Sequence, residues 1–213
     1  MMKKVMAVVL IITGILLISY PKLKETYYNI QQEKMMQLWE DALTELTEYG
    51  DTAYNENTIE EELSKKTAEE ERKIKEEYIS KHMEGLLYIE KINLKMPILT
   101  GITKKNLAIS AASIEGTGSP GEPGNYCIAA HRGRTFGRQF NRLDELVKGD
   151  IIEVLSKETK YKYEVTEKLL VKAEDTWVLM PDGKEKLITL ITCDYSTEPW
   201  QRLIIKGRLI KDN

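Results

Sequence analysis

The hydrophobic period changes at Gly85, and this change limits the fold more than any other feature of the sequence. Beyond it, short segments rich in apolar and β-branched residues alternate with turn residues, which is typical of strands. A stretch rich in glycine and proline, GSPGEPGN at 118–125, predicts a loop between them. The strand-like segments are GLLYIEKINLKMPIL, which breaks at Pro97, then YCIAAH, GDIIEVLS, KYKYEVTEKLLV, KLITLITC and RLIIKGRLI. Seven or eight strands within 85–213, with little room for helices, predict an all-β barrel or sandwich.

The first residues of the chain read as a membrane anchor. Lys3 and Lys4 precede an uncharged run of sixteen residues, Val5 to Tyr20. As a helix this run is about 24 Å long, slightly short of a hydrocarbon core of about 30 Å. The residues after it, Pro21 and the stems of two lysines, can make up the difference at the interface. A cleaved signal peptide would end in a small-x-small site, which Ser19-Tyr20-Pro21 matches poorly. We therefore expect a transmembrane anchor over 1–23, with the remaining chain outside the cell.

The segment 24–84 is expected to form a helical extracellular arm. Apolar residues recur at three- and four-residue steps between Lys24 and Tyr49, which predicts a helix. The turn-like stretch YGDTAYNEN follows, and Thr58 with Glu61 fits a capping box for a second, charged helix ending near Met83. The domain boundaries expected from these patterns are 1–23, 24–84 and 85–213.

Composition excludes two classes of function. Lysine and arginine number 31 against 34 acidic residues, and the formal charge of -3 offers no general basis for binding nucleic acid. Two cysteines and two histidines are too few ligands for a structural Cys/His zinc site. No cofactor is expected.

Three residues at expected strand ends carry the candidate chemistry. Cys193 ends the run LITLIT, His131 closes YCIAAH, and Arg202 follows Cys193 by nine positions. Alone, the cysteine reads as a small buried apolar residue and the histidine as a surface residue. Together, a thiol, a histidine and an arginine suit nucleophilic acyl transfer. A free thiol is only a few per cent ionised at pH 7, so nearby cations would stabilise the thiolate.

These residue types allow three distinct roles. Cys193 is the expected nucleophile, and His131 is the acid that protonates the leaving amine. Arg202 is permanently charged and cannot act as a base, but its five donors can hold a substrate carbonyl and the developing oxyanion.

The second cysteine, Cys127, is expected to belong to the core. On one extended strand its side chain lies roughly 13 Å from that of His131, too far for direct contact. A disulfide between Cys127 and Cys193 stays open, because an extracellular location permits it.

At these residues the chain resembles the sortases, membrane-anchored cysteine transpeptidases of Gram-positive bacteria. TLITC at 189–193 is similar to the TLxTC signature of that family, with Cys193 as its nucleophile. IAAHRGRTFGRQFNRL resembles the segment of the catalytic histidine, His131, and QRLIIKGRL resembles the strand that carries the arginine, Arg202. The similarity runs from about Gly85 to Leu209. It implies an eight-stranded β-barrel with short helices.

The resemblance also implies substrates. A sortase cleaves LPxTG-like C-terminal sorting signals between Thr and Gly and transfers the surface protein to an amine of a peptidoglycan precursor or a pilin. Thr192, next to the nucleophile, would help line the substrate groove. The histidine segment looks like class D, with class A or class E as alternatives. Calcium, which some class A members bind, would need clustered carboxylates; Glu115 and Asp175 are available, but nothing in the sequence establishes a site.

Three other classes of protein could also account for a cysteine and a histidine in an extracellular chain. An L,D-transpeptidase sets its cysteine in a Ser-x-Gly-Cys turn, and no glycine precedes Cys193. A papain-like peptidoglycan hydrolase has its cysteine before its histidine, the reverse of the order here. The remaining alternative is a non-catalytic, membrane-anchored cell-surface binding module, in which Cys193 belongs to the core and Arg202 is a surface charge.

Overall fold

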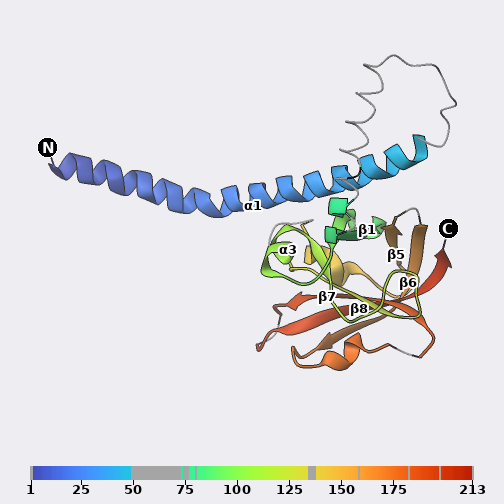
Figure 1. The fold of residues 1–213 in the computed structure, drawn as a ribbon. Coiled ribbons are helices and arrows are strands. Elements are labelled where there is room, and N and C mark those ends of the chain that lie inside the picture. The colour runs from blue at the N-terminus through green and yellow to red at the C-terminus, as the bar shows by residue number, and fades with distance from the viewer. Residues whose placement is uncertain are drawn as a thin grey trace, which may run out of the picture.

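Eight strands close into a barrel in the computed structural model (Figure 1), which describes residues 2–48, 73, 77–79, 81–133, 138–157, 159–181, 183–196 and 198–212. Around the barrel the strands follow the order β1-β2-β3-β4-β7-β8-β6-β5, and β5 pairs with β1 to close the sheet. Their bounds are β1 Met83–Ile89, β2 Leu94–Leu99, β3 Ala111–Ser113, β4 Gly124–Ala129, β5 Ile151–Ser156, β6 Thr159–Val171, β7 Lys186–Asp194 and β8 Gln201–Asp212. The predicted all-β, eight-stranded fold is confirmed.

Among the described residues, one long helix and several short ones accompany the strands. The long helix is α1, Met2–Glu48. The short ones are α3, Lys104–Ile109, and three 3₁₀ turns, η1 at Glu90–Ile92, η2 at Phe140–Glu145 and η3 at Thr176–Leu179. The predicted charged helix from Thr58 lies largely outside the described residues, although 77–79 and 81–82 are helical.

Two details of the predicted strand pattern differ from the structure. The strand expected to break at Pro97 continues through it as β2, which ends at Leu99. Pro97 precedes the two residues of β2 that pair with β3, Ile98 and Leu99, so its missing N–H falls outside that short ladder. Strand β3 was not among the predicted segments, because three residues are too short to show an alternating pattern.

The predicted loop at 118–125 lies between β3 and β4 over residues 118–123, and its last two predicted residues, Gly124 and Asn125, already belong to β4. Gly121 has φ of +76°, and a Cβ atom there would lie 2.0 Å from Cε1 of Tyr161. The Gly121 N–H donates to the Tyr163 hydroxyl at 2.8 Å, which fastens the loop to β6. Only glycine fits this combination of backbone angle and close approach.

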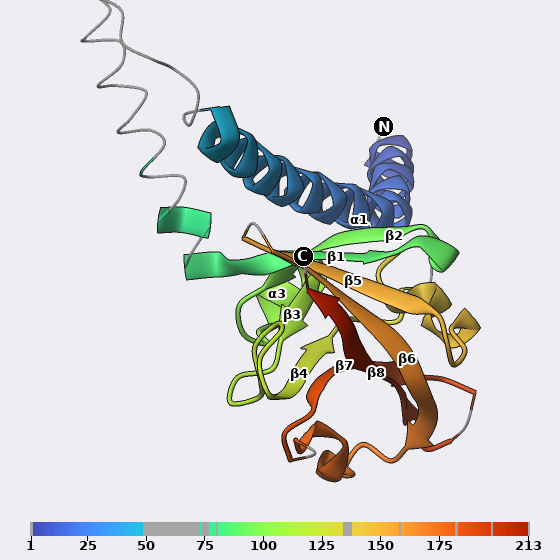
Figure 2. The ribbon, with the colours of Figure 1, turned by 90° about the vertical axis from the view of Figure 1, so that its right-hand side faces the viewer.

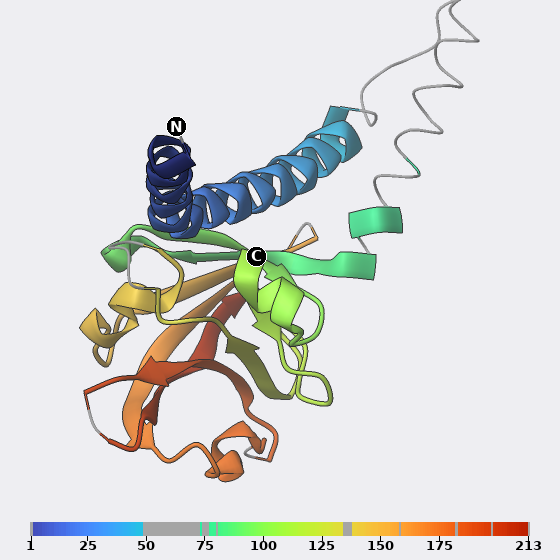
Figure 3. The same cartoon turned by 90° about the vertical axis from the view of Figure 1, so that its left-hand side faces the viewer.

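The second half of helix α1 runs across the barrel beside β1 and β2, and its first half extends beyond the barrel, as Figure 1 and the two rotated views in Figure 2 and Figure 3 show. The helix contains Pro21 and bends between its two halves, as expected where proline removes a backbone donor. Trp39 of the second half is 4% exposed and packs with Met83, Leu86 and Ile109 of the barrel domain. The helical stripe predicted after Lys24 therefore includes a face that packs on the barrel domain.

The predicted transmembrane anchor over 1–23 is not confirmed as such. Those residues are helical where described, but within the described chain no helix combines the length and the apolar character needed to cross a membrane.

The barrel interior holds the main apolar core. Ile128 of β4, Leu190 of β7 and Ile205 of β8 are 0% exposed and belong to it. A second apolar layer lies outside the same strands, where Ile191 and Ile204 pack with Val178 of η3. Side chains alternate between the two faces along a strand. The face of any other residue on β4, β7 or β8 therefore follows from its spacing to these inner and outer residues.

Candidate active site

Cys193 lies near the end of β7 on the outer face of the barrel wall. Leu190 points into the core, and Thr192 and Asp194 continue that buried side of the strand. Ile191 and Cys193 therefore face outward. Cys193 is a half-buried free thiol.

Arg202, the second residue of β8, lies opposite Cys193 in the antiparallel ladder between β7 and β8. Directly opposite residues share a face, with Cβ atoms typically about 5 Å apart. Leu203 and Ile205 belong to the inner core, which places Arg202 on the outer face with Ile204. Its Nη1 donates to the carbonyl of Gln201 at 3.3 Å.

His131 follows the end of β4, which runs parallel to β7 with Ala129 opposite Ile191. The N–H of Ala130 donates to the Ile191 carbonyl at 3.1 Å, so the two strands stay together beyond β4. If the register continues for two residues past Ala129, His131 lies opposite Cys193. Ala130 belongs to the core, which turns His131 outward, and the His131 side chain is exposed.

Three neighbouring strands thus bring the three predicted residues to one place. Adjacent strands lie about 4.8 Å apart, so the ends of β4, β7 and β8 present His131, Cys193 and Arg202 side by side on the outer face. In the strand order β7 is central, so Cys193 lies between the strand that leads to His131 and the strand that carries Arg202.

Thr192 occupies different surroundings from those expected of a groove-lining residue. Its side chain is 2% exposed, on the opposite face of β7 from Cys193. The Thr192 hydroxyl donates to the Ala130 carbonyl at 2.9 Å and so joins β7 to the residue before His131.

Cys127 belongs to the buried part of β4, as predicted. It is a free thiol with 0% exposure, and it lies opposite Thr189 in the ladder between β4 and β7. Thr189 is four residues from Cys193, roughly 13 Å along the strand, so the two thiols are too far apart for a disulfide. Burial raises the pKa of the Cys127 thiol to about 11.

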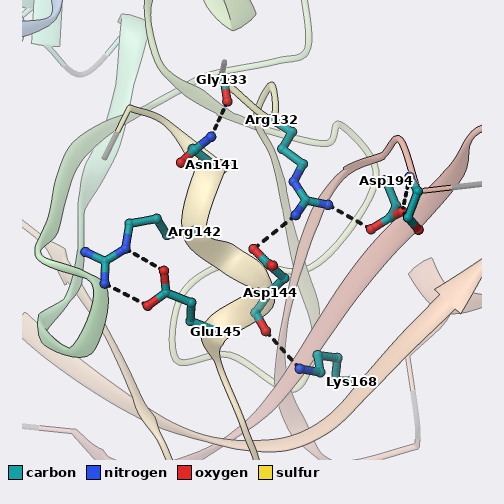
Figure 4. A network of polar contacts seen from close by, with 9 residues as sticks. Arg132, Gly133, Asn141, Arg142, Asp144, Glu145, Lys168 and Asp194 are labelled. Carbon is teal, nitrogen blue, oxygen red and sulfur yellow. Dashed lines mark hydrogen bonds and ion pairs between the residues drawn. The ribbon is translucent and has the colours of Figure 1, made fainter. Parts of the chain in front are cut away.

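An ion-pair network joins the residues that directly follow His131 and Cys193 (Figure 4). Arg132 pairs through Nη1 with Asp194 at 2.7 Å and through Nη2 with Asp144 of η2 at 3.1 Å. Asp194 also accepts the N–H of Ser196 at 2.8 Å and the Ser196 hydroxyl. These bonds from Ser196, followed by the Arg132 guanidinium, hold the pKa of Asp194 below its usual range despite burial.

The sequence interpretation did not include Arg132 or Asp194. The signal was available: they directly follow His131 and Cys193, and they carry opposite charges. The sequence does not reveal that the segments after His131 and after Cys193 lie side by side.

Exposed aromatic side chains lie in the loop that follows the strand of Cys193 and on η3. Tyr195 and Trp200, in the β7–β8 loop, are 46% and 56% exposed, and their rings meet edge to face with centroids 5.0 Å apart. Trp177 of η3 is 54% exposed, with Lys206 Nζ 5.4 Å from its ring centroid. Apolar surface is therefore available beside Cys193 for a peptide side chain.

Metal ligands do not gather at this site. Across the described ranges, no three side chains of His, Cys, Asp or Glu are grouped to hold a metal ion. Of the two carboxylates considered for calcium, that of Asp175 accepts the N–H of Lys172 at 2.8 Å in a turn. A cavity of about 480 Å³ opens elsewhere, lined by residues such as Tyr88, Ile151 and Lys162.

The chain is similar to several sortases in both sequence and fold. A sortase A of Bacillus anthracis is 33% identical over 130 residues, which cover 61% of this chain and 61% of that protein. A sortase D of Bacillus subtilis is 24% identical over 98% of this chain and 100% of its own length. Among solved structures, a sortase D5 transpeptidase of Clostridium perfringens superposes with a TM-score of 0.58 at 31% identity, covering 82% of this chain and 99% of that one. The Sortase domain family matches residues 87–210, the whole barrel but for its first and last residues, and the chain accordingly belongs to the sortase family.

Proposed function

We propose that this chain is a cysteine transpeptidase that cleaves LPxTG-like sorting signals between Thr and Gly and transfers the acyl group to an amine. The observation that carries the proposal is the pairing of β4, β7 and β8: Cys193 lies opposite Arg202, and β4 ends opposite Ile191, two residues before His131 on its own strand and two before Cys193 on the other. A thiol between a proton donor and a fixed cation suits acyl transfer through a thioester.

In the first half-reaction the Cys193 thiolate attacks the carbonyl carbon of the substrate threonine. The carbonyl π electrons move to oxygen, and the Arg202 guanidinium stabilises the resulting oxyanion. Collapse of the tetrahedral intermediate breaks the C–N bond to glycine, while the His131 imidazolium gives its proton to the leaving nitrogen. The products are a thioester on Cys193, neutral His131 and a free glycine amine.

In the second half-reaction an amine attacks the thioester carbon. Neutral His131 takes the proton that the amine loses, and the C–S bond breaks to return the thiolate. The new amide joins the surface protein to its acceptor, for which we propose a peptidoglycan precursor or a pilin amine. Both charged groups are restored, so the cycle needs no cofactor.

Thr192 supports this reaction from behind the site. Its burial and its bond to the Ala130 carbonyl suit a residue that fixes the end of β4 against β7. We propose this positioning role for Thr192 in place of direct contact with the sorting signal.

The location we propose is the outer surface of a cell membrane. The first half of α1 exposes apolar side chains on all sides: Val9, Leu10, Ile11, Ile12, Ile15, Leu16, Leu17 and Ile18 are each more than half exposed. A helix that is apolar all round needs an apolar environment, which a bilayer supplies. We propose class D, whose members are among the relatives at both the sequence and the structural level.

The experiment uses full-length protein in membranes. Washed membranes should retain the protein and cleave an LPxTG-like peptide between Thr and Gly, and mass spectrometry should detect the acyl group on Cys193. Cys193→Ala should abolish both cleavage and adduct, because no other described thiol lies at this surface.

Cys127→Ala is the matched control, since it removes the other thiol from the neighbouring strand and should leave the adduct in place. Unchanged turnover in Cys193→Ala, or no adduct with a panel of sorting peptides, would refute the transpeptidase. Recovery of active protein in the wash would refute the anchor alone.

A further inference from the structure

Few backbone hydrogen bonds join the chain segment that carries His131 to the end of the strand that carries Cys193. In the described chain, the ladder between β4 and β7 ends with the Ala130 N–H bond to the Ile191 carbonyl, and Thr192 adds one side-chain bond to Ala130. His131 and Cys193 both lie beyond these bonds.

The next pair along the same register is charged. Arg132 and Asp194 are separated by 62 positions, as are Ala129 and Ile191. Their side chains meet at 2.7 Å and are 21% and 9% exposed (Figure 4). This charge-assisted hydrogen bond joins the two strands at a position where the backbone hydrogen bonds between β4 and β7 have ended.

Alternation places this pair on the reverse side of the site. Arg132 follows His131 and Asp194 follows Cys193, so the charged pair points away from the face on which the thiol lies. It is therefore suited to hold the two strand ends, and not to touch substrate.

Both partners are themselves fixed. Ser196 donates twice to Asp194 and orients its carboxylate, while the second arm of Arg132 reaches Asp144 in η2. The Asp144 side chain is 49% exposed, which makes this outer arm the weaker attachment.

We propose that Arg132 and Asp194 form an interstrand clamp that sets the separation between the His131 imidazole and the Cys193 sulfur. Both are positioning residues, and the inference rests on the proposed transpeptidation. The clamp also places a guanidinium against the carboxylate next to Cys193, so that the Asp194 charge is compensated where the thiolate must form.

The test measures kcat and KM separately with an LPxTG-like peptide on the full-length protein. Arg132→Gln and Asp194→Asn should each lower kcat roughly 10- to 100-fold, because small misplacements of reacting groups have effects of this size. KM should stay within about two-fold, since the clamp does not touch substrate. The double variant should be no slower than the slower single variant, because the pair acts as a unit.

Three further variants separate positioning from general stability. Arg132→Lys keeps the bond to Asp194 and should recover part of kcat, and it also serves if a neutral variant fails to fold. Asp144→Asn removes only the exposed arm and should cost less than Asp194→Asn. Glu145→Gln breaks the bidentate pair with Arg142 on the same 3₁₀ turn, away from both strands, and should leave kcat unchanged.

The clamp is refuted if folded Arg132→Gln or Asp194→Asn keeps kcat within two-fold of the starting protein. It is also refuted if only KM changes, or if Asp144→Asn costs as much as Asp194→Asn. Each of these results can occur while Cys193→Ala still abolishes the thioester, so the clamp can fail without the proposed function. An active Cys193→Ala variant would instead remove the proposed function itself.

Discussion

At the scale of single residues, the two cysteines show how position decides chemistry. Cys127 faces outward from the middle of β4 but is covered, and burial keeps it as the neutral thiol by raising its pKa to about 11. Cys193 lies at the end of the neighbouring strand, half-buried, opposite an arginine. Two cysteines on adjacent strands therefore differ in role: Cys127 packs in the protein interior, and Cys193 is the candidate nucleophile.

Replacing Arg202 by lysine tests the proposed oxyanion clamp. An ammonium is a point charge, whereas the guanidinium offers a planar fork of donors to the carbonyl oxygen. Arg202→Lys should lower kcat by about 100- to 1000-fold, the range seen when an oxyanion donor is lost. Steady-state kinetics with a sorting peptide check this.

Arg208→Lys is the matched control for that variant. It lies on the same strand and pairs with Glu185 at 2.8 Å, but its side chain is 56% exposed. Its kcat should be unchanged. A fully active Arg202→Lys enzyme would remove Arg202 from the mechanism.

At the scale of secondary-structure elements, α1 combines two different surfaces. Its first half exposes apolar side chains, and its second half packs on the barrel through Trp39 with Met35 and Met36 beside it. Glu25 pairs with Arg138 at 3.4 Å, and Lys95 of β2 pairs with Glu40, so charges flank the packed face. Arg138 belongs to the segment that follows His131, which links α1 to the vicinity of the site.

Truncating Trp39 should weaken this packing. Removal of a buried tryptophan side chain costs about 3 to 5 kcal/mol in a protein core. Trp39→Ala should therefore lower the free energy of unfolding by an amount near the bottom of this range, measured in urea by circular dichroism. Ile30→Ala removes an apolar side chain that is 46% exposed on the same helix and should change stability by less than about 0.5 kcal/mol. Equal effects of the two variants would show that α1 does not depend on Trp39 for docking.

At the scale of the whole molecule, the barrel encloses tyrosine hydroxyls that stay protonated well above the usual pKa of tyrosine. Burial raises the pKa of Tyr163 to about 12 and that of Tyr126 well above its ordinary value. Tyr126 donates to Glu84 at 2.8 Å, and Tyr163 accepts from Gly121, so both hydroxyls tie distant segments across the barrel. Cys127, which is buried on the outer face of β4, is a further acid whose pKa is raised by burial.

Stability should consequently fall at alkaline pH. Unfolded cysteine and tyrosine lose protons near pH 8.5 and 10, whereas the folded chain retains them to about 11 for Cys127 and about 12 for Tyr163. Between these limits the unfolded state binds fewer protons, so the free energy of unfolding decreases as pH rises; below about pH 8.5 these groups add no pH dependence. Urea unfolding from pH 7 to 11 measures the slope.

Cys127→Ala should make this decline shallower between about pH 8.5 and 11. Ile128→Val trims the buried residue next to Cys127 without removing a titratable group or a bond to the thiol, so it should shift the whole curve and leave its slope unaltered. An identical slope in Cys127→Ala and the parent protein would contradict the role of the buried thiol.

Much of the fold could be predicted because alternation and turns are local properties. The strands other than β3, the loop that begins at Gly118 and the helix after Lys24 follow from spacing and from glycine and proline within a few residues. The errors arose where a local signal was overruled: Pro97 continues its strand because the affected N–H falls outside the short β3 ladder. Strand β3 itself carries too few residues to show a period.

The sequence by itself determined which segments become strands, and it indicated His131, Cys193 and Arg202 as residues whose chemistry belongs together. Only the tertiary structure decided that β4 and β7 pair in parallel with an offset of 62 positions, that Thr192 turns inward, and that Arg132 meets Asp194 behind the site. The physical reason is that alternation is encoded residue by residue, whereas register arises from pairing between distant strands when the barrel closes.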